Sequence, residues 1–548
     1  MKAHDNRTLP SEVLIVGAGP VGLALAVELR LRGIDVQVID GIRDIGHWWT
    51  RAMNMNKRTM EHMRRWGLSE RLKAINYVPR GWPSNVALIE RHGGRQIACA
   101  RAEGLGWGRT LPDASEDALW VAQGQVQQVL LEHARKLGAR VTFDACATEL
   151  LCNADGTVQV FGRTTVGSRT WHARYVVGCD GSHSFVRTAV GIACGGAGPL
   201  SRQISIFFRA PNLLDAMRSH GIADSVMYFC ADTVTPGTSR LICGDRWEFT
   251  YRPPQPVDES RFDPHPVLRN LLGSDCHYTL ERVYPFSYAE QIAAELRAGP
   301  VFLAGDAAHT IPPLGGHNLN LGFGDAVNLG WKLAHVLRGW AGDALLDSFG
   351  RERLPMIART AHEARQNYER LHATFARLAT WMTLRADDDR NRLGEAIARD
   401  LEPQWRSDGT VLDQRYEDSP VIAAESTRAP PYDPTRYQGA ALPGHRAPMY
   451  RDTFGTPLYD RLGAEYTLLD VATDREPGLL LHRRLCKHIP VSYLHLPEPA
   501  LRERYGAHFT LIRPDQHIAW RADTAPLDIE ALVTHITGHP SPDQRRSA

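Results

Sequence analysis

A glycine-rich turn between a predicted strand and a predicted helix constrains this chain more than any other feature. The apolar run at residues 12–16 ends at GAGPVG, residues 17–22, which opens a helix predicted to run to about residue 32. A second predicted strand, at 35–39, leads to Asp40. In such a unit the glycines let a pyrophosphate approach the backbone, the helix N-terminus stabilises its charge, and the acid accepts hydrogen bonds from a ribose. The sequence therefore predicts a dinucleotide site, with a turn that only packs as the alternative.

Length, charge and cysteine spacing exclude several other classes of protein. A chain of 548 residues is too long for one hydrophobic core, so we expect two or three domains. Its 63 basic and 62 acidic residues give no general field for nucleic acid or an anionic membrane. Nine scattered cysteines without a C-x-x-C pair, and histidines without metal-ligand spacing, argue against a disulfide framework and a metal centre. With neither a signal peptide nor a membrane-length apolar run, we expect a cytoplasmic protein.

Further motifs indicate which dinucleotide is bound. Residues 178–187 read GCDGSHSFVR, residues 305–306 read Gly-Asp after a predicted buried strand, residues 312–322 read PPLGGHNLNLG, and residues 325–333 read DAVNLGWKL. Together with the N-terminal glycine turn, this order resembles the class A flavoprotein monooxygenases of the aromatic (phenol) hydroxylase group. The resemblance covers about residues 12–370.

The resemblance implies an α/β fold with three parts. These are a glutathione-reductase-type FAD-binding Rossmann domain, an inserted β-sheet substrate domain and a C-terminal thioredoxin-like domain. The FAD-binding domain would comprise residues 1–80, 110–200 and 285–400, the substrate domain 81–109 and 201–284, and the C-terminal domain 410–548. The C-terminal part resembles its family counterpart through RPDQHIAWR at 513–521, and without a C-x-x-C pair we expect no dithiol chemistry there. A polar, proline-rich stretch at about 403–447 is predicted to be a linker.

The same resemblance implies non-covalent FAD, with NAD(P)H as co-substrate. The implied FAD contacts are Gly17, Gly19, Pro20, Val21, Asp40, Gly41, Arg51, Gln123, Asp180, Gly181, Asp306, Asn318, Leu319 and Asn320. Asp306 would hydrogen-bond the ribityl chain, and Asp180 with Gly181 would lie near the pyrophosphate and influence NAD(P)H use. The backbone N–H groups of Leu319 and Asn320 would face the flavin pyrimidine edge, where negative charge accumulates on reduction.

The loop at 312–322 departs from the family pattern at two positions. Position 318 is Asn where the family usually has Gly, and position 317 is His where a small or apolar residue is common. Because Asn tolerates positive φ better than most residues, we expect Asn318 to adopt it. His317 would contact substrate or flavin and is a catalytic candidate; a solvated or structurally satisfied histidine is the alternative.

Other candidates lie outside the cofactor motifs. His47 is a second catalytic candidate, in an aromatic segment (His47-Trp48-Trp49) that either covers the flavin or simply packs. Substrate candidates are Pro313 in the loop and Tyr228, Arg246 and Tyr251 in the inserted sheet, although sequence does not show which of these point inward.

The activity implied is hydroxylation of a phenolic ring. NAD(P)H would reduce FAD, O2 would form a C4a-hydroperoxide, and the protein would place and polarise the phenol while excluding water. A small substituted phenol or nitrocatechol in degradation is slightly favoured over a polyphenolic biosynthetic intermediate. The alternatives are a flavin oxidase or dehydrogenase, and a non-catalytic FAD-binding protein. The expected partners are the aromatic substrate and O2, with no nucleic acid or membrane, in a monomer or homodimer.

Overall fold

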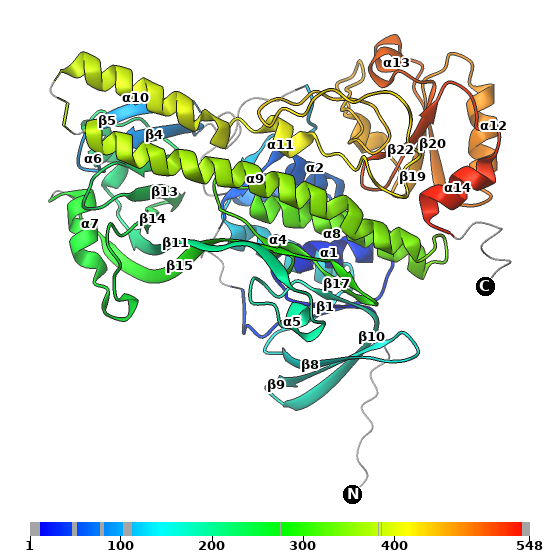
Figure 1. Cartoon of the computed structure of the whole chain (residues 1–548), viewed down its shortest axis with the longest axis horizontal. Helices are drawn as coiled ribbons and strands as arrows, with labels where there is room; N and C mark the ends of the chain where they lie inside the picture. The colour runs from blue at the N-terminus through cyan, green and yellow to red at the C-terminus, as the bar shows by residue number, and fades with distance from the viewer. Residues whose placement is uncertain are drawn as a thin grey trace, which may run out of the picture.

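The strands of this protein form two eight-stranded sheets, one four-stranded sheet and one two-stranded sheet. The computed structural model describes residues 11–45, 52–76, 82–101, 112–274, 276–381, 383–384 and 386–539. In Figure 1 the first eight-stranded sheet lies on the lower side of the molecule, the second under the left end of a long helix, and the four-stranded sheet above the right end of that helix. In the part of the chain so described, no helix is long and apolar enough to span a membrane.

The first sheet has the order β16-β17-β10-β1-β2-β7, with β8 and β9 joined to β10. Strands β17, β10, β1, β2 and β7 run parallel, and their apolar side chains are buried on both faces, as parallel sheets require. The strands are β1 (Ser11–Val16), β2 (Val36–Ile39), β7 (Arg140–Thr142), β8 (Cys146–Cys152), β9 (Val158–Thr164), β10 (Gly167–Gly178), β16 (Arg297–Ala298) and β17 (Val301–Leu303).

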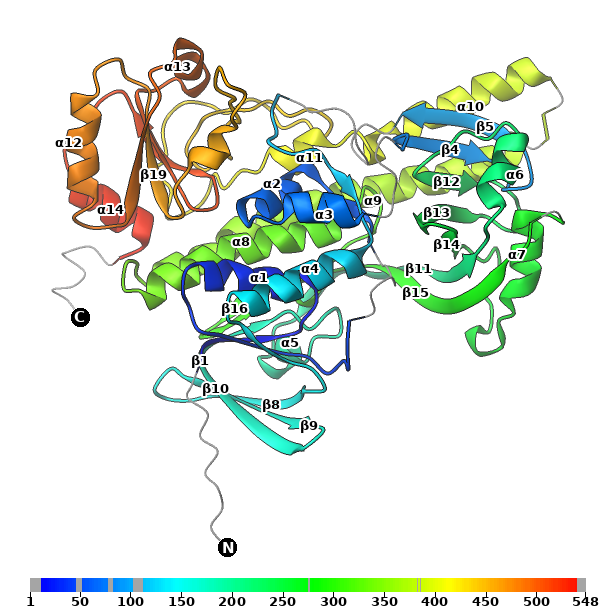
Figure 2. The same cartoon turned by 180° about the vertical axis from the view of Figure 1, so that it is seen from behind.

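Helices pack on the first sheet and carry the predicted motifs. Helix α1 contacts both α4 and α8, and Figure 2 shows these three side by side. The helices are α1 (Pro20–Leu31), α2 (Lys57–Arg65), α3 (Ser69–Ile75), α4 (Gln123–Lys136), α5 (Phe185–Ala189) and α8 (Asn318–Leu337). The stretch at 57–75 forms two helices and not one, because Gly67 takes a φ of +74° between α2 and α3. Strands β3 (Asn54–Met55) and β6 (Leu119–Trp120) form the two-stranded sheet.

The second sheet has the order β18-β15-β11-β14-β13-β12-β4-β5 and two different faces. Helices α6 (Leu213–Ser219) and α7 (Pro264–Leu272) cover one face, while α9 (Ala344–Trp381) and α10 (Asp387–Leu401) cover the other. Figure 1 shows α9 crossing the whole molecule. The strands are β4 (Asn85–Ile89), β5 (Gln96–Arg101), β11 (Cys194–Arg209), β12 (Met227–Cys230), β13 (Gly237–Cys243), β14 (Arg246–Tyr251), β15 (Thr279–Ala293) and β18 (His309–Thr310).

The C-terminal domain has the strand and helix order of a thioredoxin-like fold. Strand β19 pairs with β20 in parallel and with β21 antiparallel, and β22 completes the sheet. Its elements are β19 (Tyr466–Asp470), α12 (Glu476–Leu485), β20 (Val491–His495), α13 (Pro499–Tyr505), β21 (Phe509–Ile512), β22 (Ile518–Ala522) and α14 (Ile529–Thr537). The stretch predicted as a linker contains α11 (Asp408–Leu412) and buries Leu412, Tyr416 and Val421, so it is packed against the rest of the protein.

Candidate active site

The glycine turn after β1 has the close contacts that only glycine allows. Gly17 takes a φ of +111°, and a Cβ there would lie 2.2 Å from the carbonyl oxygen of Cys179. A Cβ on Gly22 would lie 2.0 Å from the Gly17 carbonyl oxygen. Gly19, the N-cap of α1, has open space where its side chain would be. Two glycines thus close the turn and the third leaves the helix N-terminus accessible, as a bound pyrophosphate requires.

Asp40 lies at the mouth of this turn. Its carboxylate accepts hydrogen bonds from the backbone N–H of Ala18, at 2.6 Å, and of Ile42, at 2.9 Å. These bonds hold the negative charge beside the turn while leaving lone pairs for ribose hydroxyls. Gly41 follows as an exposed residue. On the other side, Gln127 of α4 donates to the Ala18 carbonyl oxygen at 2.8 Å.

The Asp180-Gly181 segment packs directly on the glycine turn, because Cys179 is the residue that fills the space over Gly17. The Asp180 carboxylate accepts hydrogen bonds from the Ser184 hydroxyl and from the Val186 N–H, at 3.0 Å. Burial raises the pKa of this carboxyl. Asp180 therefore orders the start of α5, and Gly181, with a φ of +85°, supplies the preceding turn. Gln123, the first residue of α4, is half-buried.

The Gly305-Asp306 loop lies against the same turn. A Cβ on Gly305 would meet Val21 at 3.0 Å, so the loop and the first turn of α1 are in contact. The Gly305 N–H donates to the Asp325 carboxylate at 3.1 Å. The Asp306 carboxylate accepts a hydrogen bond from the side-chain amide of Asn318 at 2.8 Å. The glycine turn, the Asp180-Gly181 segment and the Gly305-Asp306 loop, which are far apart in sequence, thus lie together. We call them the cofactor cradle.

Asn318 does not have the positive φ that the sequence predicted. It is the first residue of α8, and Gly315 (φ +94°) and Gly316 (φ +70°) make the turn instead. Because these glycines already reverse the chain, Asn318 needs no strained backbone. Its amide bridges Asp306 and His309, whose Nδ1 lies 3.0 Å from the Asn318 Oδ1.

The N-terminus of α8 fits an electron-rich edge of a cofactor. The first N–H groups of a helix have no preceding turn to accept their bonds, and they form its positive end. Here they belong to Asn318, half-buried Leu319 and Asn320. The Asn320 side chain is fully engaged elsewhere, with Asn54, Asn56, Thr59 and Gly316 as partners, so it anchors the loop to β3 and α2.

His317 is buried at the N-cap of α8, with 3% of its surface exposed. Within the described ranges its Nε2 has no hydrogen-bond partner. Burial lowers its pKa to about 4, so the imidazole is neutral at physiological pH. The unpaired His317 Nε2 is consistent with a group bound against this loop. The cofactor cradle and the N-terminus of α8 together fit FAD. Pro313, in the same loop, is exposed.

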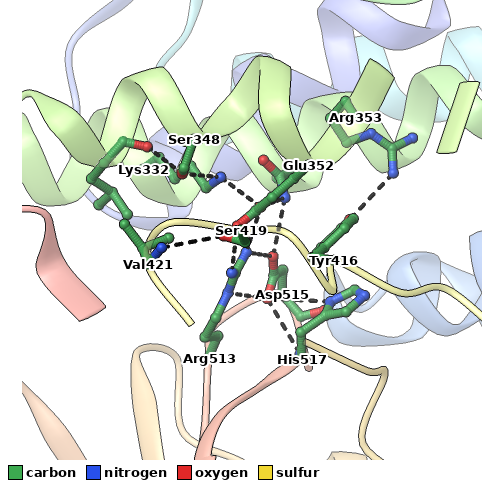
Figure 3. A network of polar contacts seen from close by, with 12 residues as sticks. Lys332, Ser348, Glu352, Arg353, Tyr416, Ser419, Val421, Arg513, Asp515 and His517 are labelled. Atoms are coloured by element: carbon green, nitrogen blue, oxygen red, sulfur yellow. Dashed lines mark hydrogen bonds and ion pairs between the residues drawn. The ribbon is translucent and has the colours of Figure 1, made fainter. Parts of the chain in front are cut away.

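The polar residues of the helix motif at 325–333 face the protein interior. Asp325 pairs with Arg353 at 2.8 Å and Lys332 with Glu352 at 2.6 Å. Figure 3 shows Glu352 also meeting Arg513 of the C-terminal domain, at 2.7 Å. These residues join α8, α9 and the C-terminal domain, and Asp325 additionally supports the Gly305 loop.

A small hollow lies between the second sheet and α9. We call it the α9 hollow. Aromatic, polar and charged side chains line it; they include Gln203, Thr238, Thr250, Arg252, Tyr288, Tyr368, Leu371, His372 and Phe375. Arg252 follows β14, β15 supplies Tyr288, and α9 supplies Tyr368, His372 and Phe375. Aromatic walls with a few polar groups are the lining that small-molecule sites typically have.

The three substrate candidates in the second sheet do not line this hollow. Tyr228 and Tyr251 are buried on the opposite face, against α6 and α7. Successive side chains of a strand alternate between faces, so Thr250 and Arg252 face α9 while Tyr251 between them points away. Arg246 pairs with Glu281 at 3.1 Å at the far end of β14.

Two groups of predictions need a further remark. His47, Trp48, Trp49 and Arg51 lie outside the described residues. Sequence reasoning missed Arg252, Tyr288, Tyr368 and His372, which no motif marks. Alternation along β14 groups Thr250 with Arg252, but the sequence does not say which face meets α9.

Comparisons with known proteins identify the family of this chain. Residues 10–364 match the family described as an FAD binding domain, and residues 438–540 match the family described as aromatic-ring hydroxylase, C-terminal. The chain is 30% identical to tetracenomycin B2 monooxygenase-dioxygenase of Streptomyces olivaceus, over 96% of this chain and 97% of that protein. It superposes on the rebeccamycin biosynthetic enzyme RebC with reduced flavin with a TM-score of 0.88, at 28% identity, over 98% of this chain and 100% of that one. It superposes on aklavinone-11 hydroxylase in a ternary complex with FAD and aklavinone with a TM-score of 0.79, at 25% identity, over 98% of this chain and 100% of that one.

Proposed function

The chain belongs to the family of FAD-dependent aromatic-ring hydroxylases, and from this premise we propose that it hydroxylates a phenolic compound held in the α9 hollow. It is an FAD-dependent monooxygenase of the kind that uses NAD(P)H and O2. This membership confirms the predicted flavoprotein fold and cofactor.

The position of the α9 hollow carries the proposal. Tyr288 lies three residues before Gln291 on β15, and Gln291 pairs with Thr310, which leads into the loop of Pro313 and His317. Leu314 of that loop belongs to the same apolar cluster as the sheet face below α9. The loop of His317 and the sheet face below α9 therefore contribute to one apolar cluster.

The side chains of the cradle have separate tasks in this proposal. The glycine turn and Asp40 hold the pyrophosphate and ribose of FAD, Asp306 holds the ribityl chain, and the α8 N-terminus faces the pyrimidine edge. FAD held there would supply the redox chemistry: two electrons from NAD(P)H would activate O2, one oxygen atom of which would enter the ring while the other leaves as water. Asp180 and Gly181 lie beside the glycine turn, where they can influence NAD(P)H use.

His317 and the hollow would prepare the substrate. A neutral imidazole with a free nitrogen can accept the phenol proton or orient the hydroxyl, which enriches the ring in electrons. The aromatic walls of the hollow displace water, which keeps the reactive oxygen for the substrate.

The names of relatives favour a polyphenolic natural-product intermediate over the small phenol that the sequence alone slightly favoured. Tetracenomycin and aklavinone appear in those names, and the matched proteins cover nearly the whole chain. We also propose action in the cytoplasm, where NAD(P)H is available, as a monomer or homodimer. All nine cysteines are unpaired, which suits a reducing compartment.

Oxygen uptake by the flavin-loaded protein tests the proposal. We expect uptake that requires NAD(P)H, rises on addition of a polyphenolic aromatic, and yields hydroxylated product in step with NAD(P)H loss. A panel of small phenols and polyphenolic anthraquinones separates the two substrate classes. Uptake without NAD(P)H would indicate an oxidase, and flavin binding without turnover on any phenol would indicate a non-catalytic protein.

A further inference from the structure

Arg252 is a half-buried cation without an acidic partner. Among the described residues, no carboxylate lies within ion-pair distance of its guanidinium. The fully buried arginines elsewhere are paired: Arg353 with Asp325, Arg446 with Glu61, and Arg513 with Glu352. Burial lowers the pKa of Arg252, which reflects the cost of a charge withdrawn from water without compensation. An anion that reaches this guanidinium would supply the missing compensation.

The polar partner of Arg252 is His372 of α9. The guanidinium nitrogen lies 2.7 Å from His372 Nδ1. A guanidinium only donates hydrogen bonds, so Nδ1 accepts and the hydrogen of the neutral imidazole is on Nε2. Burial, together with the charge of Arg252, lowers the pKa of His372 and keeps this ring neutral. The Arg252–His372 pair therefore carries one positive charge, and the Nε2–H group of His372 is a further hydrogen-bond donor.

The surroundings of this pair suit an aromatic ring. Arg252 lies 5.3 Å over the Phe375 ring, and the His372 ring lies 4.3 Å from that of Tyr368. Tyr288 meets Tyr368 edge to face at 6.3 Å. Burial raises the pKa of Tyr288 to about 12, so its hydroxyl stays protonated and can donate to an anionic oxygen.

We propose that Arg252 and His372 form an anion subsite that selects aromatic substrates carrying an ionised oxygen, either a carboxylate or an acidic phenolate. The proposal rests on the proposed function, because it places the substrate in the α9 hollow. With the anion at Arg252, the remaining ring system extends along β15 toward Thr310 and the loop that carries His317.

Binding to the oxidised, flavin-loaded protein tests the subsite without turnover. The probes are 3-hydroxy-2-naphthoic acid, its neutral carboxamide, and 2,4-dinitrophenol as an ionised phenol without a carboxylate. Dissociation constants come from the change in the flavin absorption spectrum. We expect the wild type to bind the acid more tightly than the amide. Arg252→Gln should weaken binding of the acid about 10–100-fold, because a charge-assisted hydrogen bond is lost. Binding of the amide should change less than about threefold.

Two further variants separate recognition from folding. Arg252→Lys keeps the charge and should recover most of the affinity for the acid. Arg202→Gln, which removes an exposed arginine of the same sheet that pairs with Glu259, should leave both affinities unchanged. A parallel loss for dinitrophenol assigns phenolates to the subsite as well, and an unaffected dinitrophenol restricts it to carboxylates.

Two results would overturn the proposal. One is a wild type that binds the acid no more tightly than the amide, and the other is an equal loss of both in Arg252→Gln. A failure of NAD(P)H-driven oxygen uptake would count against the proposed function alone, since these binding measurements need no reductant.

Discussion

Two arginines meet the long helix α9 from different parts of the protein, and their surroundings differ completely. Arg513 of the C-terminal domain pairs with Glu352 at 2.7 Å and with Asp515 at 2.6 Å, in the network of Figure 3. Arg252, below the same helix, has His372 as its polar partner. Arg513 is fully buried and paired with carboxylates, whereas half-buried Arg252 has no carboxylate partner within the described chain.

This difference distinguishes a charge that stabilises the fold from a charge that is available to bind a ligand. Around Arg513, Glu352 also accepts hydrogen bonds from Lys332 and Ser419, so the charged donors Arg513 and Lys332 both have a carboxylate acceptor. Removing one member leaves a buried charge unpaired, which is strongly destabilising. Around Arg252 the compensation is incomplete, and a ligand that supplies it gains binding energy without disturbing the fold.

Removing the carboxylate of the paired region should have the largest effect. Glu352→Gln leaves Arg513 and Lys332 without their shared anion, and we expect the free energy of unfolding to fall by about 3–5 kcal/mol. Denaturant titration of the flavin-loaded protein measures this. Glu132→Gln, which breaks an exposed pair with Arg71, is the control and should cost less than about 1 kcal/mol. An equal fall in the free energy of unfolding in Glu352→Gln and Glu132→Gln would contradict the structural role of the buried pair.

The pH dependence of stability sharpens the same point. Burial alone would raise the pKa of Glu352, but the charges of Arg513 and Lys332 outweigh it and hold this pKa below its ordinary value. A carboxyl with a lowered folded-state pKa contributes stability above its unfolded value, about 4.3, and loses it as pH falls further. The wild type should therefore lose stability below about pH 4, and Glu352→Gln should show a shallower loss.

His317, whose Nε2 has no hydrogen-bond partner among the described residues, gives the next largest effect. We expect His317→Ala to keep FAD affinity and to lower hydroxylation about 10²-fold, with more uncoupled peroxide. General acid–base groups contribute about 10²–10⁴-fold, and a pKa of about 4 makes this imidazole a weak base, hence the low end. The same low pKa implies an equal loss from pH 5.5 to 8. His220→Ala, at an exposed position after α6, is the control. Wild-type turnover and coupling in His317→Ala would return His317 to a packing role.

Replacing Asp40 should have an intermediate effect, because two backbone N–H groups already use part of the hydrogen-bonding capacity of its carboxylate. Asp40→Ala should weaken FAD binding by about 1–3 kcal/mol, because charge-assisted bonds to a ribose are lost. Fluorescence titration of the flavin-free protein measures the affinity. Asp35→Ala, which removes a surface carboxylate paired with Arg140, should leave it unchanged. An unaltered FAD affinity in Asp40→Ala would mean that the fingerprint does not bind the ribose.

Asn318 is fully engaged, and its replacement should have the smallest effect. Asn318→Gly removes the amide bridge between Asp306 and His309 and should cost about 0.5–1.5 kcal/mol of FAD affinity. Because Asn318 is helical, Asn318→Val should be no more than slightly worse than Asn318→Ala. A much larger penalty for Val would indicate a positive φ after all.

Part of the fold could be predicted from the sequence, because some residues report the local geometry of the backbone. The turn at 17–22 and the predicted strands at 12–16 and 35–39 correspond to elements of the structure, because glycine placement and apolar runs report local geometry. Arg252 and His372 are 120 residues apart, and only the packing of α9 on the second sheet joins them. Asn318 was misjudged because the two preceding glycines, and not the residue itself, absorb the strained turn.

Locating a bound probe would test most directly whether the unpaired charge marks the ligand site. Crystals of the flavin-loaded protein soaked with a brominated hydroxynaphthoic acid give the bromine position by anomalous scattering. We expect the ring in the α9 hollow with its carboxylate on Arg252, and no bromine signal there in Arg252→Gln. A probe bound elsewhere in the wild type, or in the hollow to the same occupancy in Arg252→Gln, would contradict the account.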